Sequence, residues 1–517
     1  MKNITRFLKN AIILTCTSLL MRGIAVAFNV YISNKVGAEA IGLYSLISSV
    51  YGFALTLATS GIALAVTRMV AEAIGQENDR LIKTSMEKCL GYALFFGTIS
   101  SALLFFFAEP IGLLWLEDER TVQPLRLMSI SLPLISLCSA MNGYFTAVRR
   151  VTRNALSQLS EQAVKIFATT VLLTFFMPDG IEYACIALVL GGTVSEIFSF
   201  FVMLILYIKD KRKHIKQSGK LPDSRAVRRR LLGIALPVAF STYARSGLLT
   251  VEHTLIPIGL RKNGSSREHS LAAYGTLTAM VMPIILFPSA LISSFASMTI
   301  PELAECVSRG HTRRIRYICE RVFQLSLVFS VGVCSVMLFC SSELGNVIYS
   351  SNEASHYIKL LAPLIPVMYL DSTTDAMLKG LGEQLYSMNV NIIDALISVF
   401  LVWLLLPIYG IEGYIFIIFF MEVINFGLSA ARLIWKTGLR PKLFRWVAMP
   451  VFCALISSNA TNLLFSRIGS HSGSAALDLT LHICTSLILY AILLIVTRTL
   501  GKDDLCWIAG IFKKDTQ

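Results

Sequence analysis

About fourteen apolar runs, each roughly 20 residues long, follow one another along the chain. A run of that length crosses a bilayer as one helix, because unpaired backbone groups are too costly inside lipid. Only 15% of the 517 residues are charged, whereas soluble proteins carry roughly 25%. The sequence therefore predicts an all-α polytopic membrane protein with about fourteen transmembrane helices. We place them near 10–32, 41–66, 89–108, 125–148, 157–177, 183–208, 231–256, 271–296, 318–340, 357–378, 386–406, 413–431, 446–465 and 475–497.

Basic residues are spread unevenly over the segments between these runs. If the N-terminus is cytoplasmic, most of the 46 lysines and arginines fall on the cytoplasmic side, and 209–230 is the most basic segment. The 109–120 loop, EPIGLLWLEDER, is acidic and falls outside. The positive-inside rule then predicts a multi-pass protein of the plasma membrane with both termini cytoplasmic. The net charge of +14 is read as a signal of topology, and no nucleic-acid partner is expected.

The two halves of the chain resemble each other at a constant offset. AEAIGQENDRLI at 71–82 aligns with AECVSRGHTRRI at 304–315, and the same offset in residue number aligns Gly42 with Gly275. Each repeat has six helices. Because this number is even, both repeats start on the same side of the membrane, so they run parallel and are related by an axis along the membrane normal. Parallel repeats of this kind are typical of transporters whose halves move around a central site.

The duplication predicts four parts of the chain. Two six-helix lobes occupy 1–208 and 231–436, and a basic cytoplasmic linker, 209–230, joins them. Two additional transmembrane helices and a cytoplasmic tail make up 437–517.

Several segments resemble a known branch of transporters. They are GAEAIGLYSL at 37–46, GIALAVTRMVAEA at 61–73, NGYFTAVRRVTRNALSQLSEQAVKI at 142–166, GIEYA at 180–184 and FPSALISSFASMTIPELAE at 287–305. Their order and spacing are similar to the stage V sporulation protein B branch of the multidrug/oligosaccharidyl-lipid/polysaccharide exporter superfamily, which is related to the lipid II flippase MurJ.

That resemblance implies a flippase working by alternating access. Its expected partners are membrane lipids and the substrate, a polyprenyl-diphosphate-linked saccharide such as lipid II or a polysaccharide repeat unit. The substrate would move from the inner to the outer leaflet. An arginine in the first helix of MurJ-like proteins matches Arg22, but a second arginine six residues later is Phe28 here.

Two arginines lie inside predicted helices at matching places. Arg22 aligns with Arg245 at a slightly smaller offset, because the second half carries an additional loop at 261–270. Intramembrane arginines normally face a water-filled cavity or a partner, and a guanidinium suits a phosphate in a bidentate fork. Both are therefore predicted to bind substrate in the cavity, and Glu252 is predicted to lie there with them. The alternative is that each arginine pairs with a carboxylate, as Arg245 could with Glu252. Asn29 and Tyr31, near the outer end of the first helix, are predicted to hydrogen-bond sugars.

Acidic residues supply the remaining candidates. Asp371 and Asp375 lie one helical turn apart in the tenth run and are candidates for lining the second lobe or for coupling to a cation, whose identity the sequence leaves open. Glu161 and Lys165 are spaced for an intrahelical ion pair.

No catalytic, cofactor or metal site is predicted. Most of the 11 cysteines lie within apolar runs without a CxxC pair, and the seven histidines form neither HxxxH nor HExxH. The protein is therefore not expected to be an enzyme. Two alternatives remain beside the flippase: a multidrug or cation exporter of the same superfamily, and a membrane enzyme acting on lipid-linked sugars.

Overall fold

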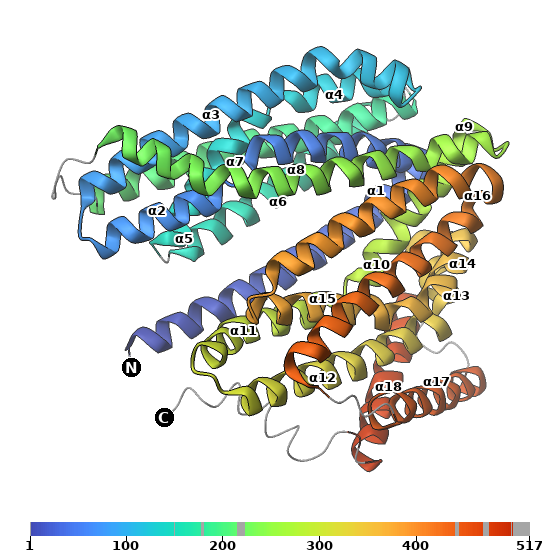
Figure 1. The fold of residues 1–517 in the computed structure, drawn as a ribbon. Helices are drawn as coiled ribbons and strands as arrows, with labels where there is room; N and C mark the ends of the chain where they lie inside the picture. The colour runs from blue at the N-terminus through green and yellow to red at the C-terminus, as the bar shows by residue number, and fades with distance from the viewer. Residues whose placement is uncertain are drawn as a thin grey trace.

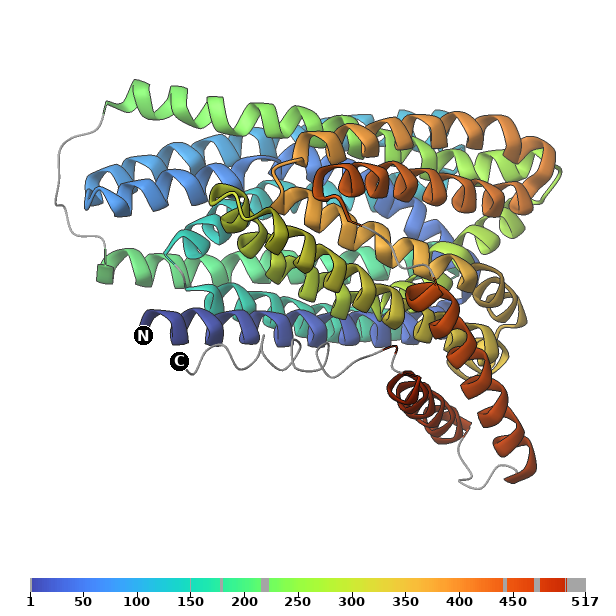
Figure 2. The same cartoon turned by 60° about the horizontal axis from the view of Figure 1, so that its bottom comes forward.

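The computed structural model describes residues 2–148, 150–176, 180–214, 223–439, 444–468, 475–497 and 499. They form helices and no strand (Figure 1). The first half contains α1 (Lys2–Thr59), α2 (Ile62–Gly75), α3 (Asp79–Pro110), α4 (Val122–Ser129), α5 (Leu132–Ala147), α6 (Val151–Phe176) and α7 (Ile181–His214). The second half contains α8 (Ser224–Lys262), α9 (Arg267–Gly275), α10 (Met282–Leu286), α11 (Ser289–Ser308), α12 (Thr312–Phe339), α13 (Ser341–Tyr349), α14 (Asn352–Leu361), α15 (Ile365–Gly380) and α16 (Gln384–Thr437). Two further helices, α17 (Met449–Ile468) and α18 (Ala475–Val496), lie beside the main bundle in Figure 2.

The all-α membrane fold is confirmed, but the count of fourteen spans is not. By length and composition, ten helices in the described ranges could cross a membrane, or eleven with a bent pair taken as one span. Two of the missing spans arise because α1 and α16 are each counted once, although each contains a glycine with non-helical backbone angles, Gly37 in α1 and Gly410 in α16. In Figure 1, α16 turns back on itself, so the segments before and after Gly410 form two arms.

The helix boundaries support the predicted duplication. α5 and α15 begin at Leu132 and Ile365 and end at Ala147 and Gly380, so both of their ends are related by the offset seen in the sequence. Both helices carry a proline in the first turn, where the missing N–H costs nothing. The left-handed residues Glu117 and Ser350, both with φ of 51°, are related by the same offset.

The domain boundaries themselves remain a prediction. The described parts of the 209–230 linker continue α7 and begin α8.

The two halves of the chain share one hydrophobic core at one end of the molecule and have separate cores at the other end. A cluster running from Phe28 to Leu479 joins buried residues of both halves near the predicted outer loops. Toward the predicted cytoplasmic ends there are two separate clusters. One is built by the first half with the start of α8, and the other by the second half with α17 and α18. The two halves are therefore held together mainly at the outer end.

Candidate functional site: a cavity between the two halves

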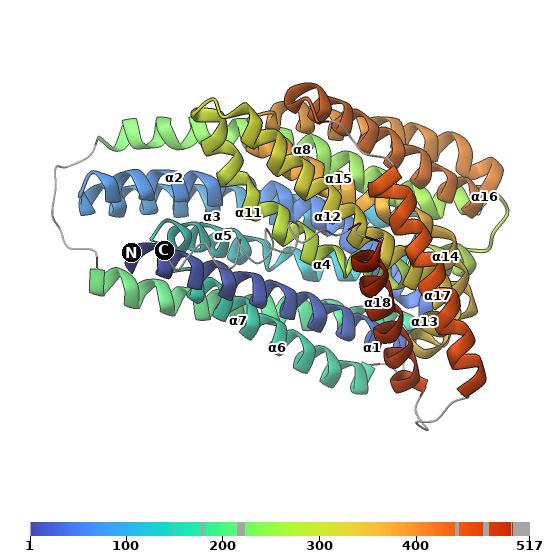
Figure 3. The same ribbon diagram turned by 90° about the horizontal axis from the view of Figure 1, so that it is seen from below.

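A cavity of about 420 Å³ lies between the two halves. One wall is formed by the part of α1 before Gly37 together with α6 and α7, which lie beside α1 in Figure 3. The π-helix η4 (Thr276–Val281) and α10 form the other wall. Its lining residues are Arg22, Ala25, Val26, Phe28, Asn29, Ile32, Tyr44, Gln162, Lys165, Thr169, Leu188, Thr278, Met282, Pro283 and Leu286. They include two cations and no carboxylate, and most of the others are apolar, so the charged side chains of the lining are all positive.

Arg22 lines this cavity. The residue is half-buried, and within the described ranges it forms neither a hydrogen bond nor an ion pair. Its neighbour Gly23 faces the second half, since a Cβ there would lie 3.8 Å from Phe287. The alternative in which Arg22 is tied to a carboxylate is not supported, and its donors are available to a ligand.

Lys165 of α6 is the second cation in the cavity wall, and sequence reasoning assigned it differently. The expected ion pair with Glu161 is not formed within 4 Å in the part of the chain that the structure describes. The nearby Glu196 is held elsewhere: the Tyr51 hydroxyl donates to its two carboxylate oxygens at 3.0 and 3.2 Å. Neither acid therefore forms an ion pair with Lys165 inside 4 Å in the described ranges, although both act on its ammonium electrostatically, and Lys165 lines the cavity.

Asn29 lines the cavity and also joins the two halves. Its side-chain amide donates to the carbonyl of Ala279 in η4. η4 is a π-helical turn, and such turns are frequent at functional sites. Tyr31 lies apart from the cavity: its side chain is exposed, and its hydroxyl oxygen accepts from Lys35 at 3.2 Å.

The remaining predicted site residues gather on α8, α15 and α16, away from the cavity wall. Arg245 is exposed and acts electrostatically on Asp371 and Asp394 without an ion pair inside 4 Å in the described ranges. Asp371 and Asp394 each hold one carboxylate oxygen buried without a hydrogen-bond partner. The structure therefore gathers these groups into a second polar cluster and does not place Arg245 beside Arg22 in the cavity.

Two other acids of this region have hydrogen-bond partners on α16. Glu252 accepts from the Ser398 hydroxyl at 2.7 Å, so it does not pair with Arg245 as the sequence suggested. Asp375 accepts from the Ser387 hydroxyl at 2.5 Å.

Sequence reasoning missed several polar residues of the cavity. Lys165, Gln162 and Thr169 lie on one face of α6, and Tyr44 lies in the part of α1 after Gly37. The i, i+3, i+7 spacing of Gln162, Lys165 and Thr169 is a signal that could have identified a polar face on an otherwise apolar helix.

Comparisons with known proteins identify the family of this chain. The profile of the family described as "Polysaccharide biosynthesis protein" matches residues 7–307, and the MatE family profile matches residues 264–404. Stage V sporulation protein B of Bacillus subtilis (strain 168) is 28% identical over 509 residues, covering 96% of this chain and 97% of that protein. The lipid II flippase MurJ of the same organism is 20% identical over 434 residues and 77% of each chain.

A solved structure supports the fold. The structure of the lipid II flippase MurJ in an inward closed conformation superposes with a TM-score of 0.71 and 15% identity, covering 93% of this chain and 99% of that one. The polysaccharide biosynthesis profile spans more than half of the sequence. On these grounds the chain belongs to the polysaccharide biosynthesis protein family, within the multidrug/oligosaccharidyl-lipid/polysaccharide exporter superfamily.

Proposed function

We propose that this transporter is a flippase for a polyprenyl-diphosphate-linked saccharide, either a peptidoglycan precursor such as lipid II or a polysaccharide repeat unit. It would carry the headgroup from the inner to the outer leaflet of the plasma membrane by alternating access between its halves, with both termini cytoplasmic. The observation that carries the proposal is that Arg22 and Lys165 line the same cavity, whose lining contains no carboxylate among the described residues.

Electrostatics favours an anionic substrate at this site. Two cations near the bilayer midplane are costly unless water or a counter-charge compensates them. A diphosphate supplies two neighbouring negative groups, and a guanidinium can hold one of them by two parallel hydrogen bonds. Asn29, Gln162 and Thr169, in the same wall, offer neutral hydrogen-bonding groups of the kind that sugars require.

The contacts between the halves support loading from the cytoplasmic side. At the predicted outer end, Arg267 of the second half binds the buried Asp118 of the first at 2.6 Å, and Arg261 binds Glu117 at 3.0 Å. The Asn34 side chain also donates to the carbonyl of Ile348 at 2.7 Å. Release to the outer leaflet would require these contacts to break while the inner ends of the halves approach.

A multidrug or cation exporter is the second candidate. The MatE profile on 264–404 and the carboxylates Asp371 and Asp394 in that half favour it. A cation in the described cavity would, however, meet Arg22 and Lys165. A membrane enzyme acting on lipid-linked sugars is the third candidate, and it would need a catalytic arrangement on the outer loops that the sequence does not supply.

Reconstitution separates these candidates. Purified full-length protein in vesicles should translocate a fluorescent polyprenyl-diphosphate saccharide, scored by quenching from outside, and should not accumulate a fluorescent organic cation. Lys165→Gln should slow lipid translocation, roughly tenfold for about 1.4 kcal/mol lost with one charge-assisted hydrogen bond. Exposed Lys83→Gln serves as the matched control. Cation transport without lipid translocation would favour the exporter, and chemical conversion of the lipid would favour the enzyme.

A further inference from the structure

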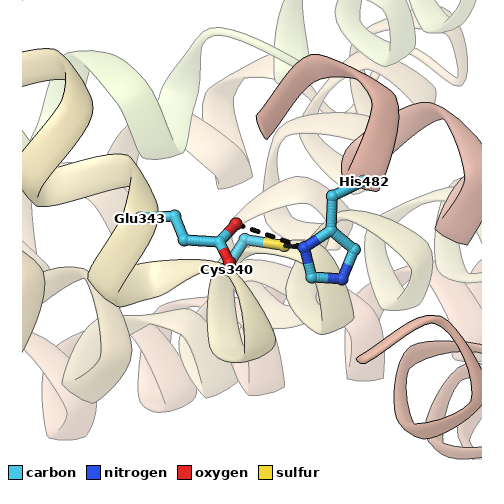
Figure 4. Close-up of side chains that lie close together, drawn as sticks. All are labelled: Cys340, Glu343 and His482. Atoms are coloured by element: carbon cyan, nitrogen blue, oxygen red, sulfur yellow. Dashed lines mark hydrogen bonds and ion pairs between the residues drawn. The ribbon is translucent and has the colours of Figure 1, made fainter. Parts of the chain in front are cut away.

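Three potential metal ligands meet where α18 packs against the second half, although the sequence predicted no metal site. Cys340 immediately precedes α13, Glu343 lies in the first turn of α13, and His482 lies in α18 (Figure 4). Their donor atoms lie within 4.8 Å of one another. Sequence reasoning missed the group because Cys340 and Glu343 are close in the sequence, whereas the third ligand comes from a helix much later in the chain.

The distances match those around a tetrahedral metal. The Cys340 sulfur lies 3.8 Å from Nδ1 of His482, and that nitrogen lies 3.2 Å from a carboxylate oxygen of Glu343. Zinc binds sulfur at about 2.3 Å and nitrogen or oxygen at about 2.0–2.2 Å. Tetrahedral angles then place sulfur–nitrogen and nitrogen–oxygen pairs roughly 3.6 and 3.3 Å apart. Small movements would therefore suffice to bring all three donors onto one ion.

The alternative is a simple hydrogen bond between His482 and Glu343. One ring nitrogen can direct its hydrogen or lone pair at one neighbour, yet Figure 4 shows both the sulfur and the carboxylate facing Nδ1. The ring is also held in place, since Phe465 of α17 stacks on it with centroids 4.7 Å apart. Cys340 and His482 are buried, while Glu343 is exposed, so the cluster combines fixed ligands with a route from solvent.

We propose that Cys340, Glu343 and His482 form a binding site for a borderline-soft divalent metal of the zinc type. Sulfur and imidazole ligands select such metals over magnesium or calcium, which prefer oxygen. The thiol would lose its proton to solvent when the metal–sulfur bond forms, leaving thiolate, neutral imidazole and carboxylate around the ion. A water molecule would complete the fourth position.

The metal site would attach α18, which lies outside the proposed duplication, to α13 of the second half. α18 already packs against α12, where the Tyr490 hydroxyl donates to the carbonyl of Val328 at 2.8 Å. The metal would add a link from α18 to α13. The far end of α13 contacts η4 through Tyr349, whose hydroxyl donates to the Met280 carbonyl at 3.0 Å.

Cobalt and zinc titrations of the purified full-length protein, after chelator treatment, test the proposal. Cobalt bound to the wild type should give a thiolate-to-cobalt charge-transfer absorption, and zinc should displace it at one equivalent per chain. Zinc should also raise the thermal unfolding midpoint, because it binds only the folded site. Cys340→Ser and Glu343→Gln should lose both the absorption and the shift. Cys484→Ser removes an exposed cysteine two residues from His482 and should behave as the wild type.

The wild-type spectrum decides the matter even if a variant folds poorly. Absence of the charge-transfer band from correctly folded wild type would overturn the proposal, as would its persistence in Cys340→Ser. Loss of the band in Cys484→Ser alone would assign the metal to a different thiol and overturn it equally.

Discussion

Gly42 of α1 and Gly275 of α9 pack against each other backbone to backbone, and they are equivalent positions of the two halves. A Cβ on Gly42 would lie 1.9 Å from the carbonyl oxygen of Leu271, and a Cβ on Gly275 would lie 2.4 Å from that of Ala38. Equivalent residues touch each other where a two-fold axis passes between repeats. The contact therefore supports the duplication and marks one place where the backbones of the two halves approach closely.

Gly42→Ala and Gly275→Ala should each destabilise the protein. The added methyl group has no room beside backbone atoms, and overpacking costs about 1–3 kcal/mol. Both variants should show a lower thermal unfolding midpoint in detergent. Gly52→Ala is the matched control in the same helix, because nothing lies within 4 Å of its Cβ position. It should be neutral or gain about 0.5–1 kcal/mol. Equal midpoints for Gly42→Ala and Gly52→Ala would contradict this close approach.

Hydropathy predicted most of the helices because each must span the same thickness of lipid. It could not predict that the two segments of α1 meet directly at Gly37, or those of α16 at Gly410, because in both cases a single glycine with non-helical backbone angles makes the kink. Arg22 and Asn29 could be identified because polar groups inside an apolar run are costly. Lys165 was misassigned, because its spacing from Glu161 suits an ion pair and only tertiary packing turns it toward the cavity.

The duplication predicts where equivalent residues lie better than it predicts their charges. Arg150, after α5, binds Asp210 at the end of α7. The equivalent position after α15 is Glu383, which binds Arg432 and Lys436 at 2.7 Å near the end of α16. Both halves therefore have an ion pair between a residue just after α5 or α15 and the end of α7 or α16, but the basic and acidic partners are exchanged. An aligned pair such as Arg22 and Arg245 can therefore share a position in its lobe without sharing a role.

The topology prediction is tested by cysteine labelling. Asp118 is a poor labelling position because it is buried, whereas Glu119 and Lys213 are exposed. In a Cys484→Ser background, Glu119→Cys should react with an impermeant thiol reagent in intact cells, and Lys213→Cys should react only after permeabilisation. Because basic residues favour the cytoplasmic side, the reverse pattern would place the basic linker outside and overturn the proposed loading face.

Arg267→Gln should loosen the outer end of the transporter. Arg267 holds Asp118 through an ion-pair contact at 2.6 Å and a hydrogen bond at 3.1 Å, and the Asp118 side chain is only 3% exposed. Losing this fork should raise the outward-open population severalfold. A cysteine at Thr278, in the cavity wall, should then react faster with an impermeant reagent from outside. Arg309→Gln, which removes an exposed pair with Glu305, is the control. Unchanged labelling would show that other contacts close the outer end.

Asp371→Asn should uncouple transport from an ion gradient if the second cluster binds the coupling cation. Among the described residues, one oxygen of Asp371 is buried without a hydrogen-bond partner, so that atom is available to a cation. Asp375→Asn is the comparison, because that carboxylate is already bound by Ser387. Flipping should be measured in vesicles with imposed sodium, proton and electrical gradients. The same gradient dependence in Asp371→Asn and the wild type would remove this role.

Arg22 gives the most direct test of the substrate site. Arg22→Lys should keep part of the flipping rate, because an ammonium still attracts phosphate but cannot form the bidentate fork. Arg22→Ala should abolish most of it, and Arg22→Glu all of it. Arg313→Ala, an exposed arginine at the start of α12, should flip lipid at the wild-type rate.

Protein abundance in the membrane must be measured alongside flipping. Removing one partner of a buried ion pair costs about 3–5 kcal/mol, because the other charge is left uncompensated. Arg22 has no such partner among the described residues, so Arg22→Ala should reach the membrane at the wild-type level. Normal abundance with lost flipping then means that the guanidinium acts on the substrate. Reduced abundance would assign Arg22 a structural role, and full flipping by Arg22→Ala would remove it from the site.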